Sequence, residues 1–372
     1  MKKLLVMAAV TVAATNAFAG IKLVVRSDYQ YTSTYENNAG VDVESTSVFT
    51  PDVARMYYTG TVGDAVVDSA FNLRSFDQEM AVDPTVGKKV MTVDTFVEHL
   101  FITKAMGDWS FSGGKLWMNV GGFERRAFYD GDTYLTSLAN GGIGGVTVVG
   151  ATPVIPGAVG SVLTPENSSG VSAAYKMGEN HKVEVQMYNQ VNRDSDLLTS
   201  ANKRHSVGVA YWGSFADKML QTYLSYNSGA ADVKGGTGHD LTYIGAGFRV
   251  APMENLNIDL EYLSNTDKYA NSGEKDETTS TILEARYKMG MWAPVLKYEM
   301  STDKVQGEDN FKRDAWALAL EITPKAEDAF RYHVAYTSIK DKDFGAAYVA
   351  GDDETTKNMV VVGFKYVGDI VK

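Results

Sequence analysis

The chain has 372 residues, of which 44% are hydrophobic, and it contains no cysteine. Its 46 acidic and 35 basic residues give a formal net charge of −11, which argues against nucleic-acid binding because that function needs a basic face. With no disulfide to constrain the chain, a large hydrophobic core or a surrounding apolar medium must hold the fold together.

The N-terminus has the three parts of a secretory signal peptide. Lys2 and Lys3 precede a short apolar run, and Ala17-Phe18-Ala19 forms a cleavage site with a small residue at each end. The apolar run is shorter than the ~20 residues of a membrane-spanning helix, which disfavours an uncleaved membrane anchor. We therefore predict a signal peptide at residues 1–19 and one mature domain at residues 20–372, whose net charge is −13 once the two lysines are removed.

In the mature domain, apolar residues recur with period two rather than 3.6, which predicts β-strands instead of helices. In one such segment, Ile258 and Leu260 alternate with Asp259 and Glu261. Taking these segments in chain order, we predict sixteen strands, at residues 21–35, 50–62, 65–76, 93–104, 109–118, 170–177, 182–190, 204–212, 219–226, 240–250, 256–263, 278–289, 293–301, 311–322, 329–338 and 357–367.

Two of these segments depart from strict alternation. In the fourth segment, the polar residues Glu98 and His99 are adjacent and therefore fall on opposite faces of the strand. In the fifth segment, we predict a β-bulge at Gly113-Gly114, because an extra residue there would change the face on which each later side chain lies.

The connections between the predicted strands alternate strictly between short and long. Seven are turns of two to six residues, such as Gly63-Asp64, and eight are long and polar, one of them about fifty residues. A transmembrane barrel has tight turns at one end and long loops at the other, whereas a soluble sandwich has no reason to separate them. The pattern predicts an all-β fold, an antiparallel up-and-down transmembrane β-barrel of about 16 strands. A soluble secreted β-sheet binding protein is the alternative.

Three segments resemble the general bacterial porin family of Gram-negative outer membranes. They are the leader that runs directly into an amphipathic strand, the hairpin that contains Arg55-Met56-Tyr57-Tyr58-Thr59-Gly60 and Phe71-Asn72-Leu73-Arg74, and the stretch from Gly114 to Glu124. The resemblance implies a homotrimeric channel in which the loop after strand five folds into the lumen and narrows it. The chain departs from the family at its end, because porins usually end in an aromatic residue and this chain ends in Asp369-Ile370-Val371-Lys372.

The resemblance also implies that function resides in the loop of about residues 119–169 and in the wall opposite it. The charged loop residues that we expect at the pore constriction are Glu124, Arg125, Arg126, Asp130 and Asp132. The basic lumen-facing residues of the first three strands that we expect on the opposite wall are Lys22, Arg26, Arg55 and Arg74. Opposed charges across a narrow, water-filled gap set up a transverse field that disfavours apolar solutes. The alternative for each residue is that it pairs only with a neighbour on the lumen wall.

The loop continues with an uncharged stretch, residues 133–165, whose glycines and prolines would break a spanning helix. We interpret this stretch as lining the barrel wall inside the lumen, with contact to a neighbouring subunit as the alternative. The outer loops carry carboxylates at Asp341, Asp343 and 352–354 that suit Ca²⁺ or Mg²⁺ bridging lipopolysaccharide. The alternative is that these carboxylates are merely solvated, and no other cofactor is expected.

The sequence carries no strong enzyme motif. The five histidines are scattered, and there is no H-E-x-x-H, G-x-S-x-G or P-loop pattern, so an outer-membrane hydrolase is a minor alternative. We predict a non-enzymatic porin in the cell outer membrane that passes small hydrophilic solutes and ions across the lipid bilayer. A channel selective for sugars or anions is the second hypothesis, although most aromatic residues fall on the lipid side of the strands. Ion preference stays open, because the net charge favours cations and the first three strands are basic inside.

Overall fold

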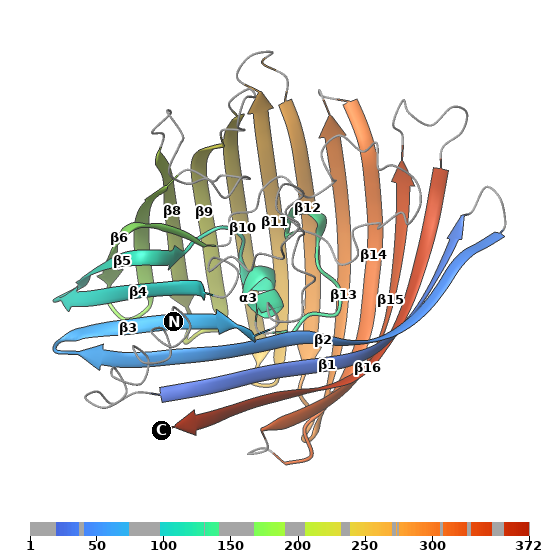
Figure 1. The fold of residues 1–372 in the computed structure, drawn as a ribbon, viewed down its shortest axis with the longest axis horizontal. Coiled ribbons are helices and arrows are strands. Elements are labelled where there is room, and N and C mark those ends of the chain that lie inside the picture. Colours follow the sequence, from blue (N-terminus) through green and yellow to red (C-terminus); the bar gives the residue numbers. More distant parts are fainter. Residues whose placement is uncertain are drawn as a thin grey trace, which may run out of the picture.

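The computed structural model describes residues 20–36, 41–73, 97–129, 131–140, 167–189, 205–231, 239–269, 273, 275–305, 308–325, 329–343 and 353–371. These residues form a closed antiparallel barrel in which each strand pairs with its neighbours in sequence and β1 pairs with β16 (Figure 1). The strands are β1 (Gly20–Glu36), β2 (Val41–Val62), β3 (Ala65–Asn72), β4 (Val97–Met106), β5 (Trp109–Trp117), β6 (Asn167–Met177), β7 (His181–Asn189), β8 (His205–Phe215), β9 (Leu220–Ala231), β10 (His239–Met253), β11 (Leu256–Tyr269), β12 (Lys275–Tyr287), β13 (Trp292–Val305), β14 (Glu308–Ile322), β15 (Phe330–Asp343) and β16 (Asp353–Val371). The predicted signal peptide lies outside the described residues.

All sixteen predicted strands are present, and the predicted barrel is confirmed. The main difference is at the long-loop end, where most strands reach further than predicted. For example, β2 begins at Val41 rather than at residue 50, and β11 ends at Tyr269 rather than at residue 263. By contrast, β3 ends at Asn72 rather than at residue 76, and β4 begins at Val97 rather than at residue 93. Strand pairing continues there through polar sequence, and period two is lost because neither face has to be apolar once the strand leaves the lipid.

The irregular fourth segment contains a β-bulge. Along β3, Ala70 pairs with His99 and Phe71 pairs with Val97, so Glu98 is the extra residue of β4. Glu98 and His99 are therefore both buried, although they are adjacent in the chain.

The predicted bulge at Gly113-Gly114 is wrong. The partners of both glycines on β4 and on β6 follow one another without any shift of register. Gly114 instead has a φ of +134°, and a Cβ at this position would lie 2.4 Å from the Leu100 carbonyl oxygen. The sequence needs glycine there because two backbones approach closely, not because a residue is inserted.

The outer surface of the barrel is apolar and its inner surface is polar. Leu318 and Val362 are 53% and 50% exposed, whereas Glu321 and His333 are 3% and 2% exposed. A water-soluble protein buries the first pair and exposes the second. This inversion is what a barrel surrounded by lipid requires, and it contradicts the soluble β-sheet alternative.

The chain enters the barrel after β5. It forms the short helix α3 (Phe123–Tyr129) and the 3₁₀ turn η2 (Leu138–Asn140), and Figure 1 shows α3 inside the ring of strands. The predicted folding of this loop into the lumen is confirmed for its described residues. Within the described segments, no helix combines the length and the apolar character that crossing a membrane would require.

Candidate functional site

The loop inside the barrel is fastened first at the start of α3. The backbone N–H of Glu124 donates a hydrogen bond of 2.6 Å to the buried carboxylate of Glu261 on β11. This carboxylate satisfies one of the N–H groups that a helix leaves unpaired in its first turn, and it lies at the positive end of the helix dipole. Gly122, which directly precedes α3, leaves room for this carboxylate, since a Cβ there would lie 2.2 Å from Glu261 Oε2.

The side chain of Glu124 forms the second attachment. It makes an ion pair of 2.5 Å with Lys297 on β13, and both side chains are almost completely buried. Glu124 also accepts hydrogen bonds from the backbone N–H and the hydroxyl of Ser137 and from the amide of Asn140. Lys297 in turn donates to the carbonyl of Leu135, at 2.6 Å. One buried ion pair therefore joins α3, the following loop and the barrel wall, and its remaining hydrogen-bonding groups are paired as a buried pair requires.

The third attachment is apolar. Tyr134 and Leu135 pack in a buried cluster with wall residues of β13 to β16, three of which are the β14 residues Ala315, Ala317 and Ala319. Alanine side chains leave the loop room to lie flat against the wall. The first part of the uncharged stretch, residues 133–140, thus lines the lumen wall, and residues 141–165 lie outside the described residues.

Tyr134 also has polar partners. Its hydroxyl donates to Glu321 at 3.0 Å, and its carbonyl accepts from the Thr337 hydroxyl at 3.0 Å. Burial and the charge of Glu321 raise the pKa of the Tyr134 phenol, so the hydroxyl keeps its proton and remains a donor.

A row of basic residues crosses three adjacent strands of the wall. Arg26 on β1 lies directly opposite Lys365 on β16, and Lys365 lies directly opposite Arg331 on β15. Like charges in directly opposed positions destabilise a sheet unless acidic groups compensate them. Arg26 is compensated by Asp28, at 2.7 Å, and it donates to the carbonyls of the loop residues Gly131 and Thr133. The row, hereafter the basic row, therefore faces the loop.

Asp132 is the loop residue that meets the basic row. Its carboxylate lies 2.7 Å from Lys365 Nζ and 2.7 Å from Arg331 Nη2, and its carbonyl accepts from Arg286 at 3.0 Å. Burial raises the pKa of the Asp132 carboxyl, but the charges of Arg331 and Lys365 outweigh burial and hold the pKa below its ordinary value. Asp132 is therefore ionised at neutral pH.

The other predicted loop residues lie elsewhere. Glu124 and Arg125 are buried, at 3% and 4% exposure, so neither borders open water. Arg126 is exposed, and its guanidinium stacks on the ring of Trp212, 3.7 Å from the ring centroid. Asp130 lies outside the described residues.

The residues predicted for the basic wall do not all lie together either. Lys22 lies near the basic row and 5.5 Å from the centroid of the Tyr57 ring. Arg55 forms an ion pair of 2.7 Å with Glu98, at the bulge of β4. Arg74 lies outside the described residues.

The structure thus brings Asp132, Lys22 and Arg26 into one region. Their partners Lys365 and Arg331, and also Lys297, were not among the residues predicted for the site. Lys365 and Arg331 both alternate with apolar, lipid-facing residues, so the alternation predicts that both face the lumen. Searching the lumen-facing positions for charged residues would therefore have identified them.

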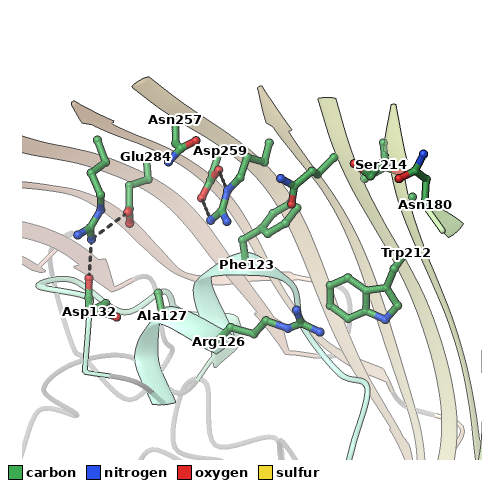
Figure 2. A pocket seen from close by; sticks show the side chains of 15 residues that line it. Phe123, Arg126, Ala127, Asp132, Asn180, Trp212, Ser214, Asn257, Asp259 and Glu284 are labelled. Carbon is green, nitrogen blue, oxygen red and sulfur yellow. Dashed lines mark hydrogen bonds and ion pairs between the residues drawn. The ribbon is translucent and has the colours of Figure 1, made fainter. Parts of the chain in front are cut away.

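Two cavities flank Asp132 near the short-turn end of the barrel. The larger, about 480 Å³, lies between α3 and the wall, and Figure 2 shows Arg126 and Ala127 of α3 across it from Asp259 and Glu284. Its charges balance, and the charged residues that line it are Arg126, Arg249, Arg286, Asp132, Asp259 and Glu284.

The smaller cavity, about 270 Å³, lies between the loop and strands β1, β15 and β16. Its lining residues are Lys22, Val24, Asp132, Thr323, Ala329, Arg331, Lys365 and Val367. Three of these residues are cationic and one is anionic, so this cavity has a net positive lining.

The part of the chain that the structure describes contains no cluster of three or more side chains suited to a metal ion. Asp341 is bound by Arg313 at 2.7 Å, and Glu354 is bound by Lys340 at 2.7 Å. Asp352 lies outside the described residues, so binding of Ca²⁺ or Mg²⁺ at the outer loops stays a prediction.

No protein-family model and no curated protein matches the chain. Solved structures do match it along nearly its whole length. The anion-selective porin from Comamonas acidovorans has a TM-score of 0.65 and 13% identity, over 95% of this chain and 100% of that chain. The chain has the fold of a bacterial outer-membrane porin. This porin-like barrel also resembles OmpT of Vibrio cholerae, with a TM-score of 0.60 and 12% identity over 94% of this chain and 97% of that one.

A third match is the outer-membrane channel DcaP of Acinetobacter baumannii, with a TM-score of 0.58 and 14% identity over 95% of this chain and 98% of that one. The resemblance to porins seen in the sequence is confirmed at the level of the fold. The porin fold crosses the outer membrane with many strands, which agrees with the apolar exterior of this barrel.

Proposed function

We propose that the protein is an outer-membrane channel through which small hydrophilic solutes and ions diffuse passively. The observation that supports this proposal is that the barrel has an apolar exterior and a charged interior, and that a loop inside the barrel is attached to the wall by a buried ion pair. A pore of this kind selects by width and by electric field and performs no chemistry, so we propose no enzymatic activity. The short turns would face the periplasm and the long loops the exterior.

Selection would occur where the loop narrows the lumen. Asp132 on the loop and Arg331 on the wall are partly exposed and opposite in charge, whereas Arg26 and Lys365 of the basic row are buried. Arg126 and Lys22 add exposed or half-buried cations nearby. Such a field orders water and disfavours solutes that cannot replace its polar contacts. Glu124 would act by holding the loop in place, and Arg125 is buried beside it. Asp130, Arg55 and Arg74 keep the constriction and wall roles that the resemblance implies.

We further propose that three copies of the chain assemble, in contact with lipid and lipopolysaccharide. The support is the porin fold together with one solved form of the Vibrio cholerae OmpT that is described as a trimer. Chemical cross-linking in mild detergent tests this, because a trimer gives bands at two and three times the monomer mass. A monomer band alone, under conditions that cross-link a known trimer, refutes it.

The channel proposal is tested by reconstituting the purified protein in a planar bilayer. We expect stepwise insertion events with a linear current–voltage relation. A protein that is fully soluble without detergent, or one that inserts with negligible open conductance, refutes the proposal. A strong saturable block by one class of solute would favour the selective channel instead.

A further inference from the structure

We propose that the smaller cavity is a binding site for short-chain carboxylate anions. We call this cavity the carboxylate pocket. It is lined by the eight residues named above and lies between the loop and strands β1, β15 and β16. The inference rests on the proposed function, since a ligand reaches the pocket through the lumen.

The lining of the carboxylate pocket carries more positive than negative charge. The side chains of Lys22, Arg331 and Lys365 line the carboxylate pocket, and the Asp132 carboxylate is the anionic group among them. Lys365 and Arg331 lie in directly opposed positions and both contact the Asp132 carboxylate, and Arg331 also lies 3.3 Å from Glu321, which is not part of the pocket lining. Among the described residues, no carboxylate is paired with Lys22. Placing like charges opposite each other costs stability, and a ligand anion would offset that cost.

The cationic side chains of the pocket are already arranged to bind a carboxylate. Asp132 shows that the wall side chains can hold a carboxylate at 2.7 Å from both Lys365 and Arg331. The Nε of Arg331 is buried and has no hydrogen-bond partner among the described residues. A guanidinium has five N–H donors, so Arg331 retains donors beyond those that it directs at Asp132 and Glu321.

The apolar part of the pocket lining and the pocket volume indicate a small organic anion. Val24, Ala329 and Val367 give the pocket apolar walls beside its cationic side chains. The volume of about 270 Å³ lies just under the ~300–1,000 Å³ of pockets that hold drug-sized molecules. A carboxylate with a few carbon atoms satisfies both the charge and the apolar walls, which a bare inorganic anion does not.

The loop backbone beside the pocket is held independently of the Asp132 side chain. The backbone at Asp132 is fixed by Arg286 and its neighbour Thr133 is fixed by Arg26. The Asp132 side chain can therefore turn away from Lys365 without displacing the loop. An incoming carboxylate would replace it there, so Asp132 acts as a competitor for the site.

The test uses sodium butyrate as the probe and the uncharged butyramide as its control. Binding is measured by ligand-observed saturation-transfer NMR on the detergent-solubilised protein, which does not depend on conduction. We expect saturable binding of butyrate and none of butyramide. Lys365→Gln and Lys22→Gln should each raise the half-saturating concentration roughly five- to tenfold, the change that one charge pair at contact distance supplies in a hydrated site.

Asp132→Asn gives the opposite expectation, a lower half-saturating concentration, and this gain keeps the test meaningful if a lysine variant folds poorly. Lys104→Gln is the matched control, because it removes the same charge from an exposed pair with Asp64 outside the pocket. Equal butyrate binding by the wild type, Lys365→Gln and Asp132→Asn would overturn the inference, as would equal binding of butyramide. Bilayer conductance separates the two proposals, since a conducting barrel that binds no butyrate refutes only the pocket.

Discussion

The buried ion pair between Glu124 and Lys297 gives the sharpest prediction about the loop. Lys297→Met removes the ammonium group while keeping a side chain of similar length. Glu124 would then be a buried carboxylate without its cation, close to Glu261, whose carboxylate accepts the Glu124 N–H. The Leu135 carbonyl would also lose its donor. Removing one partner of a buried pair costs about 3–5 kcal/mol, which is a shift of about 10²–10⁴-fold in the equilibrium between attached and detached loop.

Single-channel recording is the assay for this change. We expect Lys297→Met to show larger or strongly fluctuating unit conductance, because the loop spends more time away from the wall. The double variant Glu124→Gln with Lys297→Met is the control, since it removes both charges together. Replacing both partners of a buried pair is close to neutral, so the double variant should recover most of the wild-type conductance.

The outcome that refutes this reasoning is also specific. If Lys297→Met conducts like the wild type while the barrel remains folded, the ion pair does not hold the loop. If the double variant is as disturbed as the single variant, the loss comes from packing around Lys297 and not from an uncompensated charge.

Three further predictions concern the wall, the pH and the lipid face. Ala317→Leu should overpack the space between β14 and the loop, at a cost of about 1–3 kcal/mol, and raise unit conductance, whereas the outward Leu318→Ala should not. Asp132 has a lowered pKa in the folded state, so its ion pairs persist from pH 7 to below the ordinary pKa of ~3.9. They are lost only as the pH falls through the folded pKa, and the zero-current potential in a salt gradient should then shift toward anion selectivity. Asp132→Asn should remove that shift. A spin label at Leu318 should be reached by lipid-soluble oxygen and not by a water-soluble relaxant, and the reverse accessibility would contradict the lipid-facing assignment.

Much of the fold was predictable because lipid and water impose period two on each strand. The alternation of Ile258 and Leu260 with charged neighbours located strands, and the lengths of the connections identified a membrane barrel. The ends of the strands were not predictable in this way, since β2 and β11 continue where both faces are polar. The glycine pair in β5 was misjudged because one-dimensional sequence does not distinguish an inserted residue from a close backbone approach.

The candidate site was only partly predictable. Lys22 and Arg26 were selected because the resemblance pointed to the first strands, and they do border the loop. Lys365 and Arg331 were passed over because their proximity to Arg26 depends on the pairing of β16 with β1, which joins the two ends of the chain. Glu124 was expected at open water, and its burial follows from Lys297, a residue more than a hundred positions away.

The basic row spans the seam at which the first and last strands meet. Arg26 lies on the first strand of the barrel and Lys365 on the last, so the row is incomplete until the sheet has closed. In a sheet that has not closed, the residues that hold Asp132 and its neighbours are not yet together. The basic row is therefore completed by the same step that closes the barrel, the pairing of β1 with β16. A barrel that has not closed would lack the charged region that we propose for selection.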